Sequence, residues 1–486
     1  MMKVLLIQPS ETDRAMVHLG LGYLAAALEN RGDTVKVLDV GVEGGSERNL
    51  LQNIEAFNPE VVGITAQTAS YSKALRISRL VKKWNHTCPV IFGGPHASIL
   101  TEEVLREPTV DIVVRGEGDA TIVELMNCLE AGDPLAGVRG ISFKQNGGIY
   151  HNETQPFVEN MDALPFPAWH LFDMDRYLAR MKGRKVAPVL SSRGCPFGCI
   201  FCYRGPAAGK TFRARSPEKI IEEIRLLQGR YGIGDILFVD DIFTLNQKRA
   251  ERICDLIIES GLDISWRCQT RADCLNIDLL HKMKASNCID ISMGIESGNT
   301  QILAATGKKI TKEKIREAFR LIKEIGISNS SSFILGLPGD TVETVKETIE
   351  FAKELNPNYA IFYAAIPYPG TELARQVVES GGKLPDSWDD YRLMSSDRAS
   401  WKMLADLKTS HLTEKELKHL LKTAQFEFQM GRFFAGGEAR GAGIRNMLQI
   451  LRLTFSRSRS PRDLVNYVVK MLSAAFLFVW GKITRP

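Results

Sequence analysis

Short apolar runs alternate with amphipathic segments along the first 140 residues of the chain. Five β-branched runs predict strands, at residues 4–7, 34–40, 61–65, 90–92 and 111–114. The segments between them carry apolar residues at helical spacing, as at Leu21, Leu24, Ala25 and Leu28. Apolar strands joined by helices are typical of a parallel sheet covered on both faces. Residues 1–140 therefore predict a doubly wound α/β domain.

A polar stretch separates this pattern from a second one. Residues 141–182 contain the segment LPFP at 164–167, which breaks regular structure, and they predict a linker. Strand and helix patterns then alternate again, with strands predicted at 187–191, 236–239, 264–268, 289–293, 331–335 and 359–363. Repeated βα units of this length predict a partial TIM-type (β/α)6 barrel at 183–400, whose active site lies at the carboxyl ends of the strands.

The remaining residues, 401–486, predict a helical region with a basic amphipathic end. Residues 431–486 hold ten basic and two acidic side chains, a net charge of +8, although the whole chain carries only +5. The apolar segment at 464–480 is shorter than a membrane span and contains Lys470, so it favours an interfacial helix on an anionic membrane. The alternative is a terminal helical cap packed on the barrel. No nucleic-acid partner is expected.

Composition excludes several protein classes. Of the 486 residues, 44% are hydrophobic and 24% charged, which is typical of globular domains and unlike disordered, collagenous or wholly membrane-embedded chains. Nine cysteines without a recognisable secretory leader fit a reducing compartment. We therefore expect a cytoplasmic protein, with peripheral contact at the inner face of the membrane if the basic tail is interfacial.

The most specific chemical signal follows the first predicted barrel strand. Cys195, Cys199 and Cys202 are spaced Cys-x3-Cys-x2-Cys, with glycines beside them. Three thiolates at this spacing each bind one iron of a cubane cluster, and without a fourth cysteine nearby one iron stays open to another ligand. A structural zinc site is disfavoured, because it needs four ligands.

Charged residues and glycines follow several of the other predicted strands. In the barrel these residues are Asp240, Asp241, Arg271, Glu296 and Gly336. In the first domain they form the turns GGPH at 93–96 and RGEGD at 115–119, neither of which is a dinucleotide-binding GxGxxG. By themselves these features have simpler interpretations, because aspartates cap helices, arginines form surface salt bridges and glycines form tight turns.

Taken together, these motifs resemble the radical S-adenosylmethionine enzymes. The spacing of the cysteines matches their signature, and GIESG at 294–298 is similar to their GxESG turn. The N-terminal unit resembles the cobalamin-binding domain that precedes the barrel in one large subgroup, with Asp119 in place of the last glutamate of a VxGEGE-like turn. The resemblance covers about residues 3 to 400.

The resemblance implies three cofactors and a set of contacts. It implies that the three cysteines hold a [4Fe–4S] cluster, whose open iron chelates S-adenosylmethionine so that reduction yields a 5′-deoxyadenosyl radical. The implied S-adenosylmethionine contacts are Asp240, Asp241, Arg271, Glu296 and Gly336. The implied cobalamin contacts are Gly93, Gly94, Pro95, His96, Gly116, Glu117 and Gly118. A DxHxxG motif is absent, so the cobalt ligand stays open, and the alternative for His96 is a turn hydrogen bond.

The function that the resemblance implies is methylation of an unactivated carbon in a small-molecule or lipid-like substrate. An electron donor such as flavodoxin or ferredoxin would reduce the cluster. The first alternative is a non-methylating reaction with the same cofactors, such as a radical cyclisation. An alternative of another class is a cobalamin sensor or an iron–sulfur electron carrier, which the three-cysteine motif and the S-adenosylmethionine contacts disfavour.

Overall fold

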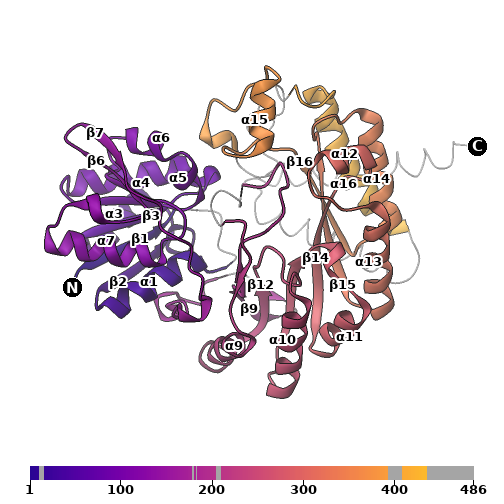
Figure 1. Cartoon of the computed structure of the whole chain (residues 1–486), viewed down its shortest axis with the longest axis horizontal. Coiled ribbons are helices and arrows are strands. Elements are labelled where there is room, and N and C mark those ends of the chain that lie inside the picture. The colour runs from indigo at the N-terminus through magenta and orange to yellow at the C-terminus, as the bar shows by residue number, and fades with distance from the viewer. Residues whose placement is uncertain (10–15, 178–179, 182, 204–208, 392–407, 435–486) are drawn as a thin grey trace, which may run out of the picture.

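The chain folds into two α/β units that lie side by side (Figure 1). The computed structural model describes residues 1–9, 16–177, 180–181, 183–203, 209–391 and 408–434. In the described chain, each unit is built on a seven-stranded sheet. The predicted α/β class, with a doubly wound domain before a partial barrel, is confirmed.

The first sheet has the order β2-β1-β3-β4-β5-β6-β7. Its parallel strands are β1 (Lys3–Gln8), β2 (Thr34–Asp39), β3 (Val61–Thr65), β4 (Val90–Gly93) and β5 (Ile112–Val114). Its helices are α1 (Leu19–Arg31), α2 (Val40–Glu43), α3 (Glu47–Phe57), α4 (Tyr71–Trp84), α5 (Pro95–Ile99), α6 (Thr101–Arg106) and α7 (Asp119–Ala131). Separate apolar cores cover its two faces, which explains why the strands are almost wholly apolar.

The predicted linker differs from the structure at its beginning. Residues 141–151 form a hairpin of β6 (Ile141–Gln145) and β7 (Gly148–His151), which continues the first sheet in antiparallel pairing beyond β5. Asn146 and Gly147 occupy the turn with φ values of 50° and 78°. An Asn-Gly pair between apolar runs is a strong hairpin signal, because this turn requires positive φ at both positions. The sequence thus contained the evidence for this hairpin.

The second sheet has the order β16-β15-β14-β13-β12-β9-β8, and the strands from β9 to β16 are parallel neighbours. Its strands are β8 (Arg180–Met181), β9 (Arg184–Val189), β12 (Ile233–Phe238), β13 (Ser265–Thr270), β14 (Cys288–Glu296), β15 (Ser328–Leu335) and β16 (Tyr359–Ala364). Its helices are α9 (Pro217–Tyr231), α10 (Gln247–Ser260), α11 (Ile277–Ala285), α12 (Thr300–Ala305), α13 (Lys312–Ile325), α14 (Val342–Leu355), α15 (Glu372–Glu379) and α16 (Glu414–Phe434). The sheet is an open half-barrel, as the βα repeats predicted.

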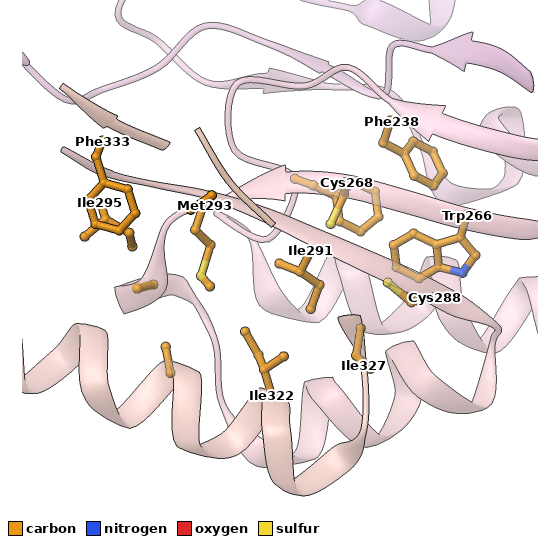
Figure 2. Packing of buried hydrophobic residues seen from close by; sticks show 14 of the residues in the cluster. Phe238, Trp266, Cys268, Cys288, Ile291, Met293, Ile295, Ile322, Ile327 and Phe333 are labelled. Atoms are coloured by element: carbon orange, nitrogen blue, oxygen red, sulfur yellow. The ribbon is translucent and has the colours of Figure 1, made fainter. Parts of the chain in front are cut away.

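The core of the half-barrel lies between its strands and the outer helices. Figure 2 shows Ile291 and Met293 of β14 pointing toward Ile322 of α13. Trp266 packs edge-on against Phe238, with ring centroids 5.6 Å apart. Outside the Cys195–Cys202 motif, five of the other six cysteines are buried, namely Cys88, Cys128, Cys254, Cys268 and Cys288, whereas Cys274 is half-buried. They act as small apolar side chains.

The helix α16 covers the β16 edge of the open half-barrel. It packs against β16 and α14 (Figure 1). Its buried side chains include Leu417, Leu421 and Phe428. The predicted amphipathic tail falls on residues 435–486, which lie outside the described residues. Within the described part of the chain, no helix is both long and apolar enough to cross a bilayer.

Candidate active site

A cavity of about 450 Å³ lies where the carboxyl ends of the two sheets face each other. Glycine turns of the first unit line one side, and residues that follow β9 and β12 line the other. The second group includes Arg193, Gly194, Tyr203 and Asp241, which surround the start of the cysteine motif. Much of the wall is apolar, formed by Leu6, Leu24, Ile64, Ile91, Ile122, Leu190 and Val239 among others. The cavity therefore places the predicted cobalamin turns next to Asp241, which is one of the five predicted S-adenosylmethionine contacts, whereas Asp240, Arg271, Glu296 and Gly336 are not part of its wall.

The glycine turns need glycine for steric reasons. Gly94 has a φ of 90°, and a Cβ there would lie 2.9 Å from both the Ala66 carbonyl oxygen and Thr65 Oγ1. Gly116 also has a positive φ, of 71°. Of the residues predicted to contact cobalamin, six line the cavity, namely Gly93, Gly94, Pro95, Gly116, Glu117 and Gly118. The four glycines among them have no Cβ, so a large flat ligand can approach the ends of the strands.

His96 does not belong to this lining. Its side chain is 1% exposed and packs against the tilted ring of Tyr71 and edge-on against Trp388, at centroid distances of 4.1 and 4.7 Å. Its Nδ1 shares a hydrogen bond with Thr68 Oγ1, and burial lowers the pKa of the imidazole to about 4. The ring is therefore a neutral member of an aromatic cluster, and its hydrogen bond to Thr68 agrees with the alternative of a turn hydrogen bond, whereas a contact of His96 with cobalamin stays a prediction.

The three motif cysteines lie close together on one loop. All three are half-buried, and the backbone N–H of Cys202 donates to the Cys199 carbonyl at 3.1 Å. Burial raises the pKa of the Cys195 thiol, and it raises the pKa of Cys199 to about 11. The nearby Cys202 raises the pKa of both thiols further. These thiols therefore need a metal or a cationic neighbour to ionise at neutral pH.

Neighbouring segments hold this loop at both ends and in the middle. Its stem is the antiparallel pair β10 (Ser192–Arg193) and β11 (Arg213–Ala214). Gly194 has a φ of 87°, and a Cβ there would overlap the Thr211 carbonyl oxygen. The Ile200 N–H donates to the Thr306 carbonyl at 2.9 Å, and Gly307 fits against the Gly198 carbonyl with no room for a Cβ.

Arg271 lies directly against the cysteine loop. Its guanidinium carbon is 3.6 Å from the centre of the Phe197 ring, and its nitrogens donate to Asp273 and to the Lys308 carbonyl. The side chain is buried, so the interpretation as a surface salt bridge is wrong. Its charge lowers the pKa of Cys195 against the effect of burial.

Glu296 lies on the same side of the loop with a strained backbone. Its φ is 72°, and its carboxylate accepts a hydrogen bond from Lys308 Nζ at 2.6 Å. Lys308 also donates to the Gly294 carbonyl at 2.6 Å, and its charge lowers the pKa of Cys199. Sequence reasoning missed Lys308, because no pattern around it distinguishes it from a surface lysine.

The paired aspartates after β12 have different roles. Asp240 is fully buried, and its carboxylate accepts hydrogen bonds from the Ser191 and Ser192 N–H groups and from the Ser191 hydroxyl. Asp241 lines the cavity. Neither caps α10, whose N-cap is Asn246, so the helix-cap interpretation is wrong. The structure brings Asp241 to the cavity and uses Asp240 to fix the end of β9.

Gly336 lies at the end of β15, beneath α16. Its φ is 84°, its N–H donates to Asp340 Oδ2 at 2.9 Å, and a Cβ would lie 2.9 Å from the side chain of Leu417. It is not among the residues that line the cavity. Its turn is therefore shaped by Asp340 and covered by the C-terminal helix.

Comparison with known proteins identifies both units. The Radical SAM superfamily model matches residues 189–352, and the B12 binding domain model matches residues 12–126. The chain is 37% identical to an uncharacterized methyltransferase of Pyrococcus horikoshii over 438 residues, which cover 88% of this chain and 93% of the relative. It is 29% identical to the anaerobic magnesium-protoporphyrin IX monomethyl ester cyclase of Rubrivivax gelatinosus, over 74% of this chain and 65% of the cyclase.

A solved structure shares the whole architecture. The cobalamin-dependent S-adenosylmethionine radical enzyme OxsB, solved with aqua-cobalamin and S-adenosylmethionine, superposes with a TM-score of 0.69 at 18% identity. The superposition covers 97% of this chain and 75% of OxsB. It confirms the order and the relative placement of the two units.

The matched domains imply cobalamin, S-adenosylmethionine and a [4Fe–4S] cluster as cofactors, and the residues present fit them. Three thiols on one loop suit a cluster, in which each thiolate binds a separate iron. Among the residues that the structure describes, no group of three or more His, Cys, Asp or Glu side chains is arranged to hold a metal ion. The glycine-lined cavity next to this loop suits a large flat ligand. The chain therefore belongs to the cobalamin-binding radical S-adenosylmethionine enzymes.

Proposed function

We propose that this enzyme methylates an unactivated carbon of a small-molecule substrate. The observation that carries the proposal is the shared cavity, whose wall includes the cobalamin-domain turns and also Arg193, Gly194 and Tyr203 from the start and end of the cysteine motif. A shared cavity allows one substrate to meet both cofactors. The similarity to a protein named as a methyltransferase supports the same reaction.

In this proposal, Cys195, Cys199 and Cys202 bind the cluster. Asp241, Arg271 and Glu296 lie near S-adenosylmethionine, with Asp240 and Gly336 shaping the ends of their strands. The cobalamin contacts are the backbone of Gly93, Gly94, Gly116 and Gly118 and the residues Pro95 and Glu117. His96 supports the first of these turns, because its backbone N–H donates to the Ala66 carbonyl at 3.1 Å.

The bound cofactors supply a 5′-deoxyadenosyl radical for hydrogen abstraction and a methyl group for transfer. The chain itself supplies a mostly apolar wall, which lowers the polarity around the reacting centre. Arg271 and Lys308 place two positive charges beside the cysteine loop, and these charges favour thiolates at Cys195 and Cys199. Asp240 holds the Ser191–Ser192 backbone from which the cysteine loop starts.

The test is anaerobic reconstitution with iron, sulfide and hydroxocobalamin, followed by reduction in the presence of S-adenosylmethionine. We expect retained cobalamin, 5′-deoxyadenosine, and S-adenosylhomocysteine that forms only when cobalamin is present. The Cys199→Ala variant serves as a control, because it should lose deoxyadenosine formation. Deoxyadenosine without S-adenosylhomocysteine would contradict methylation and favour a cyclisation like that of the Rubrivivax relative, which shares the same two-domain region.

We also propose an electron donor of the flavodoxin or ferredoxin class and a cytoplasmic location with peripheral membrane contact. The support for membrane contact is the +8 net charge and the apolar pattern of residues 431–486. Full-length protein should sediment with anionic liposomes at low salt, and a chain ending at Gly431 should not. Equal sedimentation of both chains would contradict this part of the proposal.

A further inference from the structure

Two buried arginines of the barrel bind two carboxylates of the cobalamin-binding domain. Arg193 contacts both oxygens of Asp119, at 2.7 and 3.2 Å. Arg213 donates to Glu117 Oε2 at 2.8 Å, and Arg193 lies 3.5 Å from Glu117 Oε1. The four side chains are only 6–12% exposed. We refer to these four residues as the arginine clamp.

The clamp holds both ends of the cysteine loop. Arg193 lies directly before Gly194, Arg213 lies at the other end of the loop, and the two residues face each other in the β10–β11 pair. Thus the stem of the cluster loop is fixed to the RGEGD turn of the other domain. The same turn lines the cavity through Gly116, Glu117, Gly118 and Asp119.

Further contacts make each end of the clamp rigid. The Arg193 guanidinium stacks on Tyr23 at 5.2 Å, and that of Arg213 stacks on Phe157 at 4.8 Å. The Val158 N–H donates to Glu117 Oε2 at 2.9 Å, and the Val158 carbonyl accepts from Arg213. Buried ion pairs resist separation, because removal of one partner leaves the other charge buried and unpaired.

Part of the clamp also faces the cavity. Glu117 Oε1 is buried and has no hydrogen-bond partner among the described residues, and both Glu117 and Arg193 belong to the cavity wall. A ligand that fills the cavity therefore contacts the clamp from the cobalamin side. Gly194 alone separates Arg193 from Cys195, and it lies so close to the Thr211 carbonyl that a Cβ would overlap it, so a shift of the clamp reaches Cys195 through one closely packed residue.

We propose that the arginine clamp couples the two cofactor sites, so that cobalamin binding tightens S-adenosylmethionine binding at the cluster. Arg193, Arg213, Glu117 and Asp119 act as positioning residues that fix the cluster loop relative to the cobalamin domain. The inference rests on the proposed function, because it needs both cofactors to be bound. Coupling of this kind is reciprocal, so S-adenosylmethionine must tighten cobalamin binding by the same factor.

The test uses the full chain loaded with its cluster under anaerobic conditions. The Kd of S-adenosylmethionine is measured by equilibrium dialysis with and without hydroxocobalamin, and the electron paramagnetic resonance spectrum of the reduced cluster is recorded in both states. For the unchanged protein we expect cobalamin to lower the Kd at least about fivefold. The spectrum should also shift when cobalamin binds.

Two variants at opposite ends of the clamp should remove the coupling. Asp119→Asn removes one charge from the Arg193 pair without changing the shape of the side chain, and Arg213→Lys loses the planar guanidinium. We expect the ratio of the two Kd values to fall below about two in either variant, and the spectral shift to disappear. Glu43→Gln is the control, because Glu43 forms an exposed ion pair with Arg176 at 2.9 Å. It should keep the full ratio.

Independence of the two cofactors in the unchanged protein would overturn the inference, even if every variant failed to fold. A ratio retained in Asp119→Asn and Arg213→Lys would overturn it as well. The proposed function fails in a different way, through absence of bound cobalamin or of 5′-deoxyadenosine. Two bound but independent cofactors would leave the proposed function intact and refute the clamp.

Discussion

The cluster loop contains two glycines whose surroundings differ sharply. Gly194, at the start of the loop, has a φ of 87°, and a Cβ there would overlap the Thr211 carbonyl oxygen. Gly198, between two of the cysteines, has no positive φ, and a Cβ added there would meet no atom within 4 Å. Alanine at the two positions therefore tests whether the geometry of the stem controls cluster assembly.

The cost of Gly194→Ala follows from two contributions. The left-handed backbone costs a residue with a Cβ about 1–2 kcal/mol. Relief of the overlap with the Thr211 carbonyl, which lies just before β11, costs about 1–3 kcal/mol more, as in other overpacked sites. The sum of about 2–5 kcal/mol reduces the population of the native loop at least about 30-fold relative to a displaced loop.

The assay is iron and sulfide content after anaerobic reconstitution, together with the visible absorbance of the cluster. We expect Gly194→Ala to load poorly, with a far-ultraviolet circular dichroism spectrum like that of the unchanged protein. Gly198→Ala should load fully, because nothing opposes its Cβ. Full loading of Gly194→Ala, or equal losses in both variants, would refute the claim that the stem geometry controls assembly.

Three further predictions follow from buried groups. The Lys308→Met variant leaves the buried carboxylate of Glu296 without its ion-pair partner, so it should lower the free energy of unfolding by about 3–5 kcal/mol in urea denaturation. Adding Glu296→Gln removes the unpaired charge and should recover part of this loss. Burial lowers the pKa of His96 to about 4 in the folded protein, whereas the same imidazole in the unfolded chain has a pKa near 6.5. Between pH 6.5 and pH 4 only the unfolded chain takes up the proton, so the free energy of unfolding should fall by up to about 3 kcal/mol as the pH is lowered over this range. His96→Phe should flatten this pH dependence in thermal melts, and an unchanged slope would contradict the assignment. Leu417→Ala should lower the free energy of unfolding by about 2–5 kcal/mol in urea denaturation, because Leu417 is 1% exposed and covers Gly336. A smaller change would show that α16 is loosely packed.

The features of the site that depend only on a short segment of the chain could be predicted from the sequence. The cysteine spacing places three thiols on one short loop whatever surrounds it, and the turns after β4 and β5 need glycine because of their own φ values. The order of strands and helices also followed from periodicity, since apolar runs and helical stripes are local properties of the chain. The β6–β7 hairpin is the local feature that our prediction overlooked, although Asn146-Gly147 signalled it.

Residue roles that depend on distant partners could not be predicted in this way. Asp240 and Asp241 are neighbours in the sequence, but only the packing of β9 beside β12 shows that the first binds Ser191 and the second faces the cavity. Likewise, His96 follows a glycine turn, yet Trp388, which lies far along the chain beyond α15 and packs against the first unit, completes its aromatic surroundings.

By itself, the sequence determined the fold class, the two-domain order and the candidate cluster ligands, because these depend on periodicity and on spacing within short segments. Only the tertiary structure decided which charges meet across the domain boundary, such as Arg193 with Asp119, and which line the shared cavity. The physical reason is that a buried charge is stable only with a partner, and the partner is chosen by the packing of two sheets rather than by proximity in the chain.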